Sequence, residues 1–387
     1  MCLTLCVSLC FGAFLFDPTN RPLKYLLLAL SVATVFWSNK QSLSRSAIRD
    51  YFDFIFPWLP WFICIFISMF IHRIENFYVD SFLLLTFLFL ALRKSMIRQE
   101  LVYGSIGLTL LIVSASIVIQ VVSQGNVETE ILQVNKNVLV PSTTLLTVVC
   151  IALLLFKRNL IDQKLQLLLV CAVLLSLVAI VVSEVRTSLL AILSLIPLVL
   201  LKKRQNILKY VLFICCIFGL LFALFWFTGR MQEGVSDLLK YQTGNSNTSW
   251  GIRLELWKLS FNAFLSKPLF GWGQQPFGDI IAAGFSFPVK TFFPKHFHSD
   301  IFNILVCCGL LGIIGWTLTI CLLIKKSWND PVQLALLLAC LAMGLTERIM
   351  YQNRVSIYLL STLWVLIYLV NWYSHSNQSH FKNAEVK

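Results

Sequence analysis

Long runs of hydrophobic residues alternate with short polar and charged clusters along almost the whole chain. A run of about 20 apolar residues is long enough to cross a bilayer as a helix, so the pattern predicts an all-α polytopic membrane protein. We expect about twelve transmembrane helices. The expected spans are residues 2–16, 24–38, 53–72, 79–92, 101–122, 138–156, 165–182, 187–201, 207–228, 299–324, 332–346 and 353–373.

One connection between these spans is far longer than the others. Residues 229–297 are richer in Gly, Pro, Asn and Ser than the rest of the chain, as in residues 241–250. Long connections without a function are uncommon, so we expect chemistry in this loop. The expected organisation is nine helices in 1–228, the loop in 229–297, three helices in 298–373 and a tail in 374–387.

The basic residues set the expected orientation. Alternate connections hold most of the Lys and Arg residues, as in the cluster Lys202, Lys203 and Arg204, whereas the short loops opposite hold few. Cytoplasmic loops collect such residues. We therefore expect both termini in the cytoplasm and the loop 229–297 on the outer side.

Composition narrows the class of protein. Of 387 residues, 58% are hydrophobic and 13% are charged, about half the charged fraction of a soluble protein. This excludes a cytosolic enzyme, a secreted domain and a protein that binds nucleic acid by surface charge. The net charge of +13 is explained first by topology, although a basic excess could also serve phosphate chemistry. The 12 cysteines form no C-x-x-C pair and lie mostly in apolar runs, which indicates small buried hydrophobes rather than disulfides or zinc ligands.

A short helix is expected inside the long loop, over residues 253–266. It would end at Lys267-Pro268, because the residue before proline resists the helical conformation. Its expected apolar face, directed at the outer membrane interface, comprises Leu254, Trp257, Phe261, Phe264 and Leu265. Arg253 would lie in the first turn, where free backbone N–H groups favour an anion. The plainer interpretation is that Arg253 lies at the membrane interface and contacts the phosphate groups of lipids.

Arg186 is a second candidate, in a four-residue outer turn within residues 181–190. A charged side chain within the membrane costs roughly 2.5–3.5 kcal/mol on insertion scales, so we expect Arg186 to have either an ion-pair partner or a function. Either Glu184 neutralises Arg186 in a structural pair, or Arg186 clamps a phosphate group with its bidentate guanidinium.

The segment from Pro294 to Ile301, P-K-H-F-H-S-D-I, brings together two of the five histidines, His296 and His298. Histidine titrates near neutral pH and so suits a general base. His298 or Ser299 would begin the next helix, with Asp300 in its first turn. Helix capping without catalysis is the plain alternative. Zinc binding by the H-x-H pair lacks an evident third ligand.

Other patterns are weaker. The chain has no D-x-D, so a metal-held nucleotide sugar is not supported, and it has neither a P-loop nor a G-x-S-x-G motif. Glu347, Arg348 and Arg354 gather at the last outer turn. Mutual ion pairing is one interpretation of these three residues, and a supporting role at a site is the other.

Together these pieces resemble bacterial O-antigen ligases, which share a superfamily with O-antigen polymerases and pilin O-oligosaccharyltransferases. Residues 248–257 and 266–273 look like the family's loop pattern. Residues 298–305 with 308–312 look like its His-Asn-x-x-L…G-x-x-G element, and 185–190 resembles its arginine turn. The family has about twelve membrane helices and one long periplasmic loop late in the chain.

The resemblance implies site residues. Two arginines and one histidine are essential in the family, and the matching positions are Arg186, Arg253 and His298. The chain departs from the pattern at Ser299, where Asn usually follows the histidine. His296 matches a frequent auxiliary histidine. Further expected substrate-binding residues are Lys295, Glu184 and Arg348.

The resemblance also implies a reaction. An inner-membrane glycosyltransferase would move O-antigen from undecaprenyl pyrophosphate to lipid A–core oligosaccharide on the periplasmic side, with inversion and without metal, cofactor or nucleic acid. The arginines would bind the pyrophosphate and His298 would deprotonate the acceptor hydroxyl. O-antigen polymerase and protein O-oligosaccharyltransferase stay open as alternatives. A transporter is a rival from another class, but no internal repeat supports it. A scaffold protein is a third.

Overall fold

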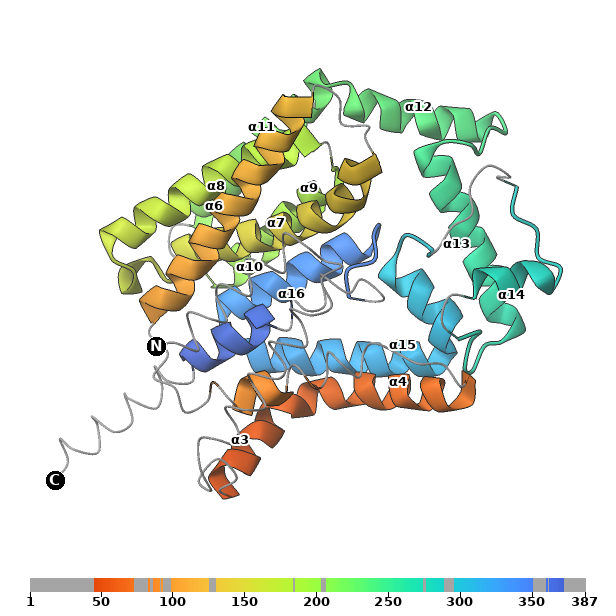
Figure 1. The fold of residues 1–387 in the computed structure, drawn as a ribbon, viewed down its shortest axis with the longest axis horizontal. Helices are drawn as coiled ribbons and strands as arrows, with labels where there is room; N and C mark the ends of the chain where they lie inside the picture. The colour runs from red at the N-terminus through yellow and green to blue at the C-terminus, as the bar shows by residue number, and fades with distance from the viewer. Residues whose placement is uncertain are drawn as a thin grey trace.

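A computed structural model describes most of the chain (Figure 1). The described residues are 45–72, 83, 86–90, 92, 99–124, 130–183, 185–202, 207–273, 276–288, 296–350, 360 and 362–371. Every regular element within these ranges is a helix. The elements are α3 (Arg45–Ile55), η2 (Phe56–Trp58), α4 (Leu59–His72), α6 (Gln99–Gln124), α7 (Glu130–Phe156), η3 (Arg158–Leu160), α8 (Gln163–Ser183), α9 (Thr187–Leu193), α10 (Leu195–Lys202), α11 (Ile207–Phe227), α12 (Arg230–Gln242), α13 (Ser249–Ser266), α14 (Phe277–Ala282), α15 (Asp300–Ser327) and α16 (Pro331–Gly344).

Within the described part of the chain, five helical segments are long and apolar enough to cross a membrane. They are Ile48–His72, Gln99–Val122, Gln163–Ser183, Ile207–Phe227 and Asp300–Ser327. Shorter apolar helices cover Val140–Phe156, Thr187–Lys202, Pro331–Gly344 and Thr362–Asn371. The described part of the chain is therefore all-helical, as expected, and its long apolar helices are those of a membrane protein.

The expected count of about twelve spans is not tested by these helices, so it stays a prediction. The spans expected at 2–16 and 24–38 lie outside the described residues. Those expected at 79–92 and 353–373 are described only in part.

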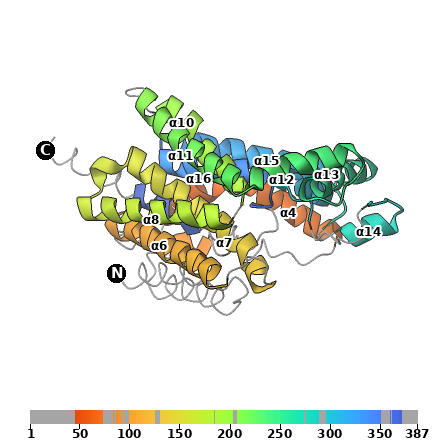
Figure 2. The ribbon, with the colours of Figure 1, turned by 90° about the horizontal axis from the view of Figure 1, so that it is seen from above.

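The long helices pack side by side, α6 along α8 and α4 along α15, while α7 contacts both α8 and α16 (Figures 1 and 2). Buried hydroxyl groups join them. Thr144 on α7 hydrogen-bonds Ser188 on α9 at 2.7 Å, and Thr147 donates to Ser176 on α8 at 2.9 Å. Such interhelical hydrogen bonds stabilise helix packing where water is absent.

The pair α4 and α15 approaches closely at Gly315. A Cβ atom at this position would lie 2.2 Å from Cys64 Sγ and 2.9 Å from the carbonyl oxygen of Pro60. Small residues allow such close packing of membrane helices. The backbone N–H of Trp61, at the start of α4, also donates to Thr319 on α15 at 3.0 Å.

The region expected as a long loop carries three helices, α12, α13 and α14, at one end of the molecule (Figure 1). The helix expected at 253–266 is confirmed and ends at Ser266, but it begins at Ser249 rather than Arg253. Thr248 is the reason, because its side chain accepts the backbone N–H of Gly251 and caps the helix.

The apolar face of α13 expected at the outer membrane interface stays a prediction. Leu256, Leu259 and Ala263 are buried, whereas Phe261 and Leu265 are 51% and 59% exposed. The buried face packs into a small core formed by Leu256, Leu259, Ala263, Phe277, Ile280, Phe297 and Val306. The helix thus uses a different set of its apolar residues to contact α15 and α14, which its own periodicity does not distinguish.

α15 is broken at Gly309, whose φ of 63° and ψ of −155° are not helical. The segment after α13 fills the break. Trp272 and Gly273 donate backbone N–H groups to the carbonyls of Val306 and Cys307 at 2.8 and 3.0 Å, while Leu310 donates to Pro268 at 2.8 Å. The backbone groups that the break frees are thereby paired, which a non-helical segment at membrane depth requires. The loop region is thus fastened to a membrane helix.

Candidate active site

The turn before α15 holds His298 in a strained conformation. His298 has a φ of 48°, the one non-glycine residue with positive φ among those described. Such a conformation costs roughly 1–3 kcal/mol and persists only where its surroundings enforce it. Asn303 supplies much of this enforcement, because its side chain accepts from the Phe297 N–H at 3.2 Å and donates to the Ser299 carbonyl at 2.6 Å. Trp257 on α13 also donates to the Phe297 carbonyl at 3.0 Å.

A second set of contacts fixes the turn against the segment after α16. Asp300 is buried, and its two carboxylate oxygens accept the backbone N–H groups of Ile349 and Met350 at 3.0 and 2.8 Å. Ser299, the residue that begins α15, donates to the Gly344 carbonyl at 3.3 Å. Ser299 and Asp300 therefore begin α15 as expected. These contacts bring His298 and residue 347 together from distant parts of the chain.

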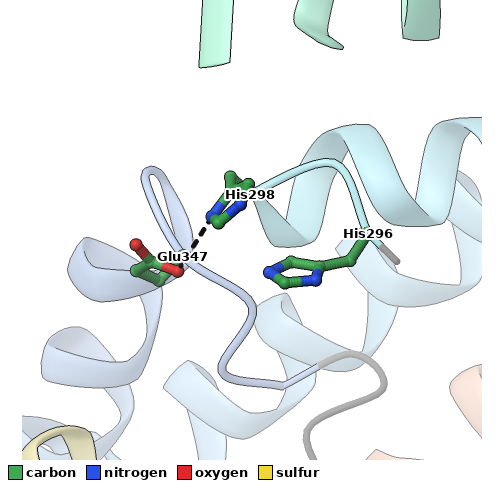
Figure 3. Close-up of side chains that lie close together, drawn as sticks. All are labelled: His296, His298 and Glu347. Atoms are coloured by element: carbon green, nitrogen blue, oxygen red, sulfur yellow. Dashed lines mark hydrogen bonds and ion pairs between the residues drawn. The ribbon is translucent and has the colours of Figure 1, made fainter. Parts of the chain in front are cut away.

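Glu347 is the centre of the cluster (Figure 3). One carboxylate oxygen accepts from Arg253 Nη2 at 2.6 Å, and the other contacts His298 Nδ1 at 3.4 Å. His296 lies beside His298, with 4.2 Å between ring centroids. The side chains of Arg253, His298 and Glu347 are 19%, 20% and 24% exposed. The cluster is thus partly buried and accessible to a ligand.

The charges and burial of the cluster favour an ionised Glu347 carboxylate and a neutral His296 imidazole. Burial alone would raise the pKa of Glu347, but the hydrogen bond with His298 and the charges of His298 and Arg253 outweigh it and lower this pKa to about 2. Burial lowers the pKa of His296 to about 2, with His298, Arg348 and Arg253 acting in the same direction and Glu347 opposing them. Because an ionised carboxylate can only accept, the contact with Glu347 requires the proton of His298 on Nδ1.

Arg186 approaches the same end of the molecule from the start of α9. Its Nη1 lies 2.4 Å from the position that a Cβ on Gly234 of α12 would take, and the indole nitrogen of Trp250 lies 3.6 Å from that position. The Arg253 guanidinium is 5.9 Å from the Trp250 ring. Both expected arginines thus lie close to Trp250, and Arg253 also contacts Glu347.

The other expected residues are placed as follows. Glu184 and Lys295 lie outside the described residues. Arg348 is described and contributes positive charge at His296. The expectation of Arg253 in a first helical turn was wrong, because the cap at Thr248 places it in the second turn. Arg253 is held instead by Glu347 and by Ser249 Oγ, to which its Nη1 donates at 2.8 Å.

Glu347 was named in the sequence only as part of an acidic and basic cluster, and its partners could not be read from spacing. The one available signal was a carboxylate in an outer turn between two apolar runs. The side chains of His296, His298 and Glu347 each offer a ligand atom, all within 4.8 Å of one another, so the third ligand missing from the H-x-H pair does exist. The adjacent guanidinium of Arg253 disfavours a cation there, however, and the positive charge fits an anion better.

Two buried nitrogen atoms of the cluster have no hydrogen-bond partner among the described residues. They are Arg253 Nε and His296 Nδ1. A buried polar group without a partner costs roughly 1–3 kcal/mol, which a polar ligand or water would relieve.

Comparison with known protein families gives a match. Residues 171–317 match a family model described as O-antigen ligase. The matched range contains Arg186, Arg253 and His298, and it ends before Glu347 and Arg348. No curated protein matches the chain.

Proposed function

Residues 171–317 of this chain match a family model described as O-antigen ligase, and on this premise we propose that the protein transfers O-antigen from undecaprenyl pyrophosphate to the lipid A–core oligosaccharide. The family supports an activity of the ligase or polymerase type on lipid-linked glycans. The ligase reaction, the bacterial inner membrane as location, the periplasmic side and the two substrates belong to the proposal.

In this proposal the arginines bind the donor. A pyrophosphate attached to a membrane lipid is an anion that a guanidinium recognises with two parallel hydrogen bonds. Arg253 and Arg186 both lie close to Trp250, so one pyrophosphate bound there could use both. Their positive charge would stabilise the charge that grows on the leaving oxygen as the bond between C1 and the phosphate oxygen breaks.

His298 serves as the general base. With its proton on Nδ1 toward Glu347, its Nε2 carries a lone pair that can accept the proton of the acceptor hydroxyl. The hydroxyl oxygen forms the new bond to C1 as undecaprenyl pyrophosphate leaves. Attack from the face opposite the leaving group inverts the anomeric carbon. General-base catalysis of this kind contributes typically 10²–10⁴-fold.

One observation carries the proposal. Within or next to the family domain, a base and an anion-binding arginine meet at one carboxylate, on a turn whose strained backbone is enforced by Asn303 and Asp300. Strained, over-determined backbone gathers at functional sites. A scaffold protein would not require it.

The test is reconstitution of the purified protein in lipid nanodiscs with undecaprenyl-pyrophosphate-linked O-antigen and lipid A–core. We expect glycan on lipid A–core, detected by gel and mass spectrometry, and a fall of at least about 10²-fold for His298→Ala. His72→Ala is the matched control, because His72 lies at the end of α4, where its ring contacts the Phe270 carbonyl.

Varying the acceptor in this assay distinguishes the ligase from the related enzymes. Longer lipid-linked glycans formed without lipid A–core would identify a polymerase, and transfer only to a Ser or Thr hydroxyl of an added pilin would identify a protein O-oligosaccharyltransferase. Unchanged activity of His298→Ala would remove the histidine from the mechanism. No transfer to any acceptor by the wild type would refute the proposal.

A further inference from the structure

The carboxylate of Glu347 serves two partners unequally. It accepts from Arg253 Nη2 at 2.6 Å, a short charge-assisted bond, whereas its other oxygen lies 3.4 Å from His298 Nδ1. The carboxylate is therefore held mainly by the arginine. Its contact with the histidine is at the long limit of a hydrogen bond.

The Glu347 side chain can shift from Arg253 toward His298 without any movement of α15 or α16. Its N–H donates to the Met343 carbonyl at 3.0 Å, and two residues later the chain is fastened to Asp300. The His298 turn is tied to the same Asp300. The Cα positions of Glu347 and His298 are thus fixed relative to each other, and a rotation of the Glu347 side chain suffices to shorten one contact as the other lengthens.

A phosphate on Arg253 competes with Glu347. A phosphate that pairs with the unpartnered Nε–H of Arg253 in a bidentate contact also takes the neighbouring Nη2–H, which Glu347 holds, and a phosphate beside the carboxylate repels it. Among the described residues, His298 is the other group seen in contact with the Glu347 carboxylate. The carboxylate released from Arg253 then closes on Nδ1–H.

We infer that Glu347 is a positioning residue shared by the donor site and the base, and that binding of a pyrophosphate at Arg253 transfers its carboxylate to His298. The inference rests on the proposed function. This exchange sets the order of events at the site. Before the donor binds, Glu347 neutralises Arg253 and leaves His298 loosely oriented. After the donor binds, Glu347 fixes the Nδ1–H tautomer, directs Nε2 at the acceptor and stabilises the imidazolium that forms as the hydroxyl loses its proton.

This arrangement predicts opposite effects on binding and on turnover. Glu347→Gln removes the competitor for Arg253, so the donor should bind several-fold more tightly. The same change removes the carboxylate from His298, so kcat should fall by at least about tenfold, but by less than the 10²–10⁴-fold expected for loss of the base itself. A residue with a merely structural role would weaken binding and turnover together.

The first measurement is steady-state transfer by the full-length protein in nanodiscs, comparing wild type, Glu347→Gln, Glu347→Asp and Glu255→Gln. Glu255 is the matched control, because its carboxylate accepts from Tyr241 at 2.6 Å and from Lys258 at 3.2 Å, away from the cluster. We expect a lower kcat with a lower donor KM for Glu347→Gln. Aspartate, one methylene shorter, should recover part of kcat. Glu255→Gln should match the wild type.

The second measurement needs no turnover. The affinity for undecaprenyl pyrophosphate is measured in His298→Ala, with and without Glu347→Gln, and again with Arg253→Gln added. Tighter binding on loss of Glu347 is expected only while Arg253 is present. An unchanged kcat for Glu347→Gln, or a joint fall of kcat and affinity, overturns the inference and leaves the proposed function standing if the wild type transfers glycan. A wild type that transfers no glycan refutes the proposed function instead, whereas the binding measurement still tests the exchange at Arg253.

Discussion

The carboxylate of Asp300 accepts the backbone N–H of Met350 at 2.8 Å and that of Ile349 at 3.0 Å, and so fastens the turn that carries His298 to the turn that carries Glu347. Asp300→Asn leaves one acceptor oxygen and directs an amide N–H at a backbone N–H. A buried unpaired donor costs roughly 1–3 kcal/mol, and we expect a loss of stability of that size together with a fall in transfer activity. The loss is measured by thermal unfolding in detergent and by glycan transfer in nanodiscs.

The control for Asp300 is Asp279→Asn, because Asp279 is an exposed residue in the first turn of α14. It should change neither quantity. Full activity of Asp300→Asn at a temperature where it is folded would show that the two turns align without this contact.

Gly234 of α12 offers a way to move Arg186 without altering it. A Cβ at Gly234 would lie 2.4 Å from Arg186 Nη1, the far end of a flexible side chain, so Gly234→Ala should displace the guanidinium and leave the fold intact. Alanine is also the better helix former by about 0.5–1 kcal/mol. We therefore expect equal or higher thermal stability with weaker donor binding, measured as a several-fold higher donor KM.

The matched control for Gly234 is Gly278→Ala in α14, where a Cβ would meet nothing within 4 Å. It should leave the donor KM unchanged. If Gly234→Ala behaves in the same way, then either Arg186 is not displaced or it does not bind the donor, and Arg186→Gln separates these two readings.

The sequence predicts the helices well and their contacts poorly. Apolar runs and the proline at 268 place α8, α11 and the end of α13 close to their observed bounds, because these features act locally. The start of α13 was missed because a threonine cap, Thr248, extends the helix backward. The side of α13 that packs inside the protein cannot be read from the sequence, because α13 is apolar on more than one side and contacts with residues such as Phe277, Phe297 and Val306 decide which side is covered.

Most residues of the candidate site were predicted from the sequence, but the contacts between them were not. Histidine and arginine are rare in apolar surroundings, so His298, Arg253 and Arg186 could be singled out from residue type and family pattern. The position of Glu347 in the site could not be predicted, because it lies 49 residues from His298 and 94 from Arg253, and contacts of Asp300 and Ser299 bring it there. The strain at His298 is likewise set by Asn303 and by contacts that no local pattern encodes.

The half-buried imidazole of His296 should make stability depend on pH. Burial lowers its pKa in the folded protein to about 2, far below the 6.5 of an exposed histidine. As the pH falls below about 6.5, the unfolded chain takes up a proton that the folded protein excludes, so stability should fall from pH 7 toward pH 5. Glu347, with its pKa lowered to about 2, adds to this loss only below about pH 4.5.

The measurement is the melting temperature in detergent between pH 8 and pH 5, for wild type and His296→Asn. The variant should show a flatter dependence over that range, even if its stability at pH 8 is lower. His72→Asn is the control, because its ring lies at an exposed hydrogen bond with Phe270. Parallel curves for wild type and His296→Asn would contradict a neutral, half-buried His296.

Transfer should not require a metal ion. His296, His298 and Glu347 have the spacing of ligands, but Arg253 already donates to Glu347 at 2.6 Å and its charge opposes a cation. We expect full activity after dialysis against EDTA and no binding of Zn²⁺ by calorimetry at micromolar concentration. Loss of activity on chelation, restored by Zn²⁺ and absent in Glu347→Gln, would show that a cation displaces Arg253.

The break in α15 should be essential to the fold of the loop region. At Gly309, φ is 63° and ψ is −155°, a conformation open essentially to glycine alone, and a Cβ there would lie 2.6 Å from the carbonyl oxygen of Leu269. Gly309→Ala is expected to push the segment after α13 out of the break, and so to free the backbone groups at Val306 and Leu310 that it pairs.

We expect this variant to lose thermal stability and transfer activity together, because α13 carries Arg253 and is joined to the break by only a few residues. Gly219→Ala in α11, where a Cβ meets nothing within 4 Å, is the matched control in a membrane helix and should retain both properties. Limited proteolysis of the loop region distinguishes the outcomes. Faster cleavage between α13 and α14 in Gly309→Ala than in Gly219→Ala would show that the segment has left the break, whereas equal protection would mean that α15 tolerates the side chain and that the backbone pairing at Trp272 and Gly273 is strong enough to hold it.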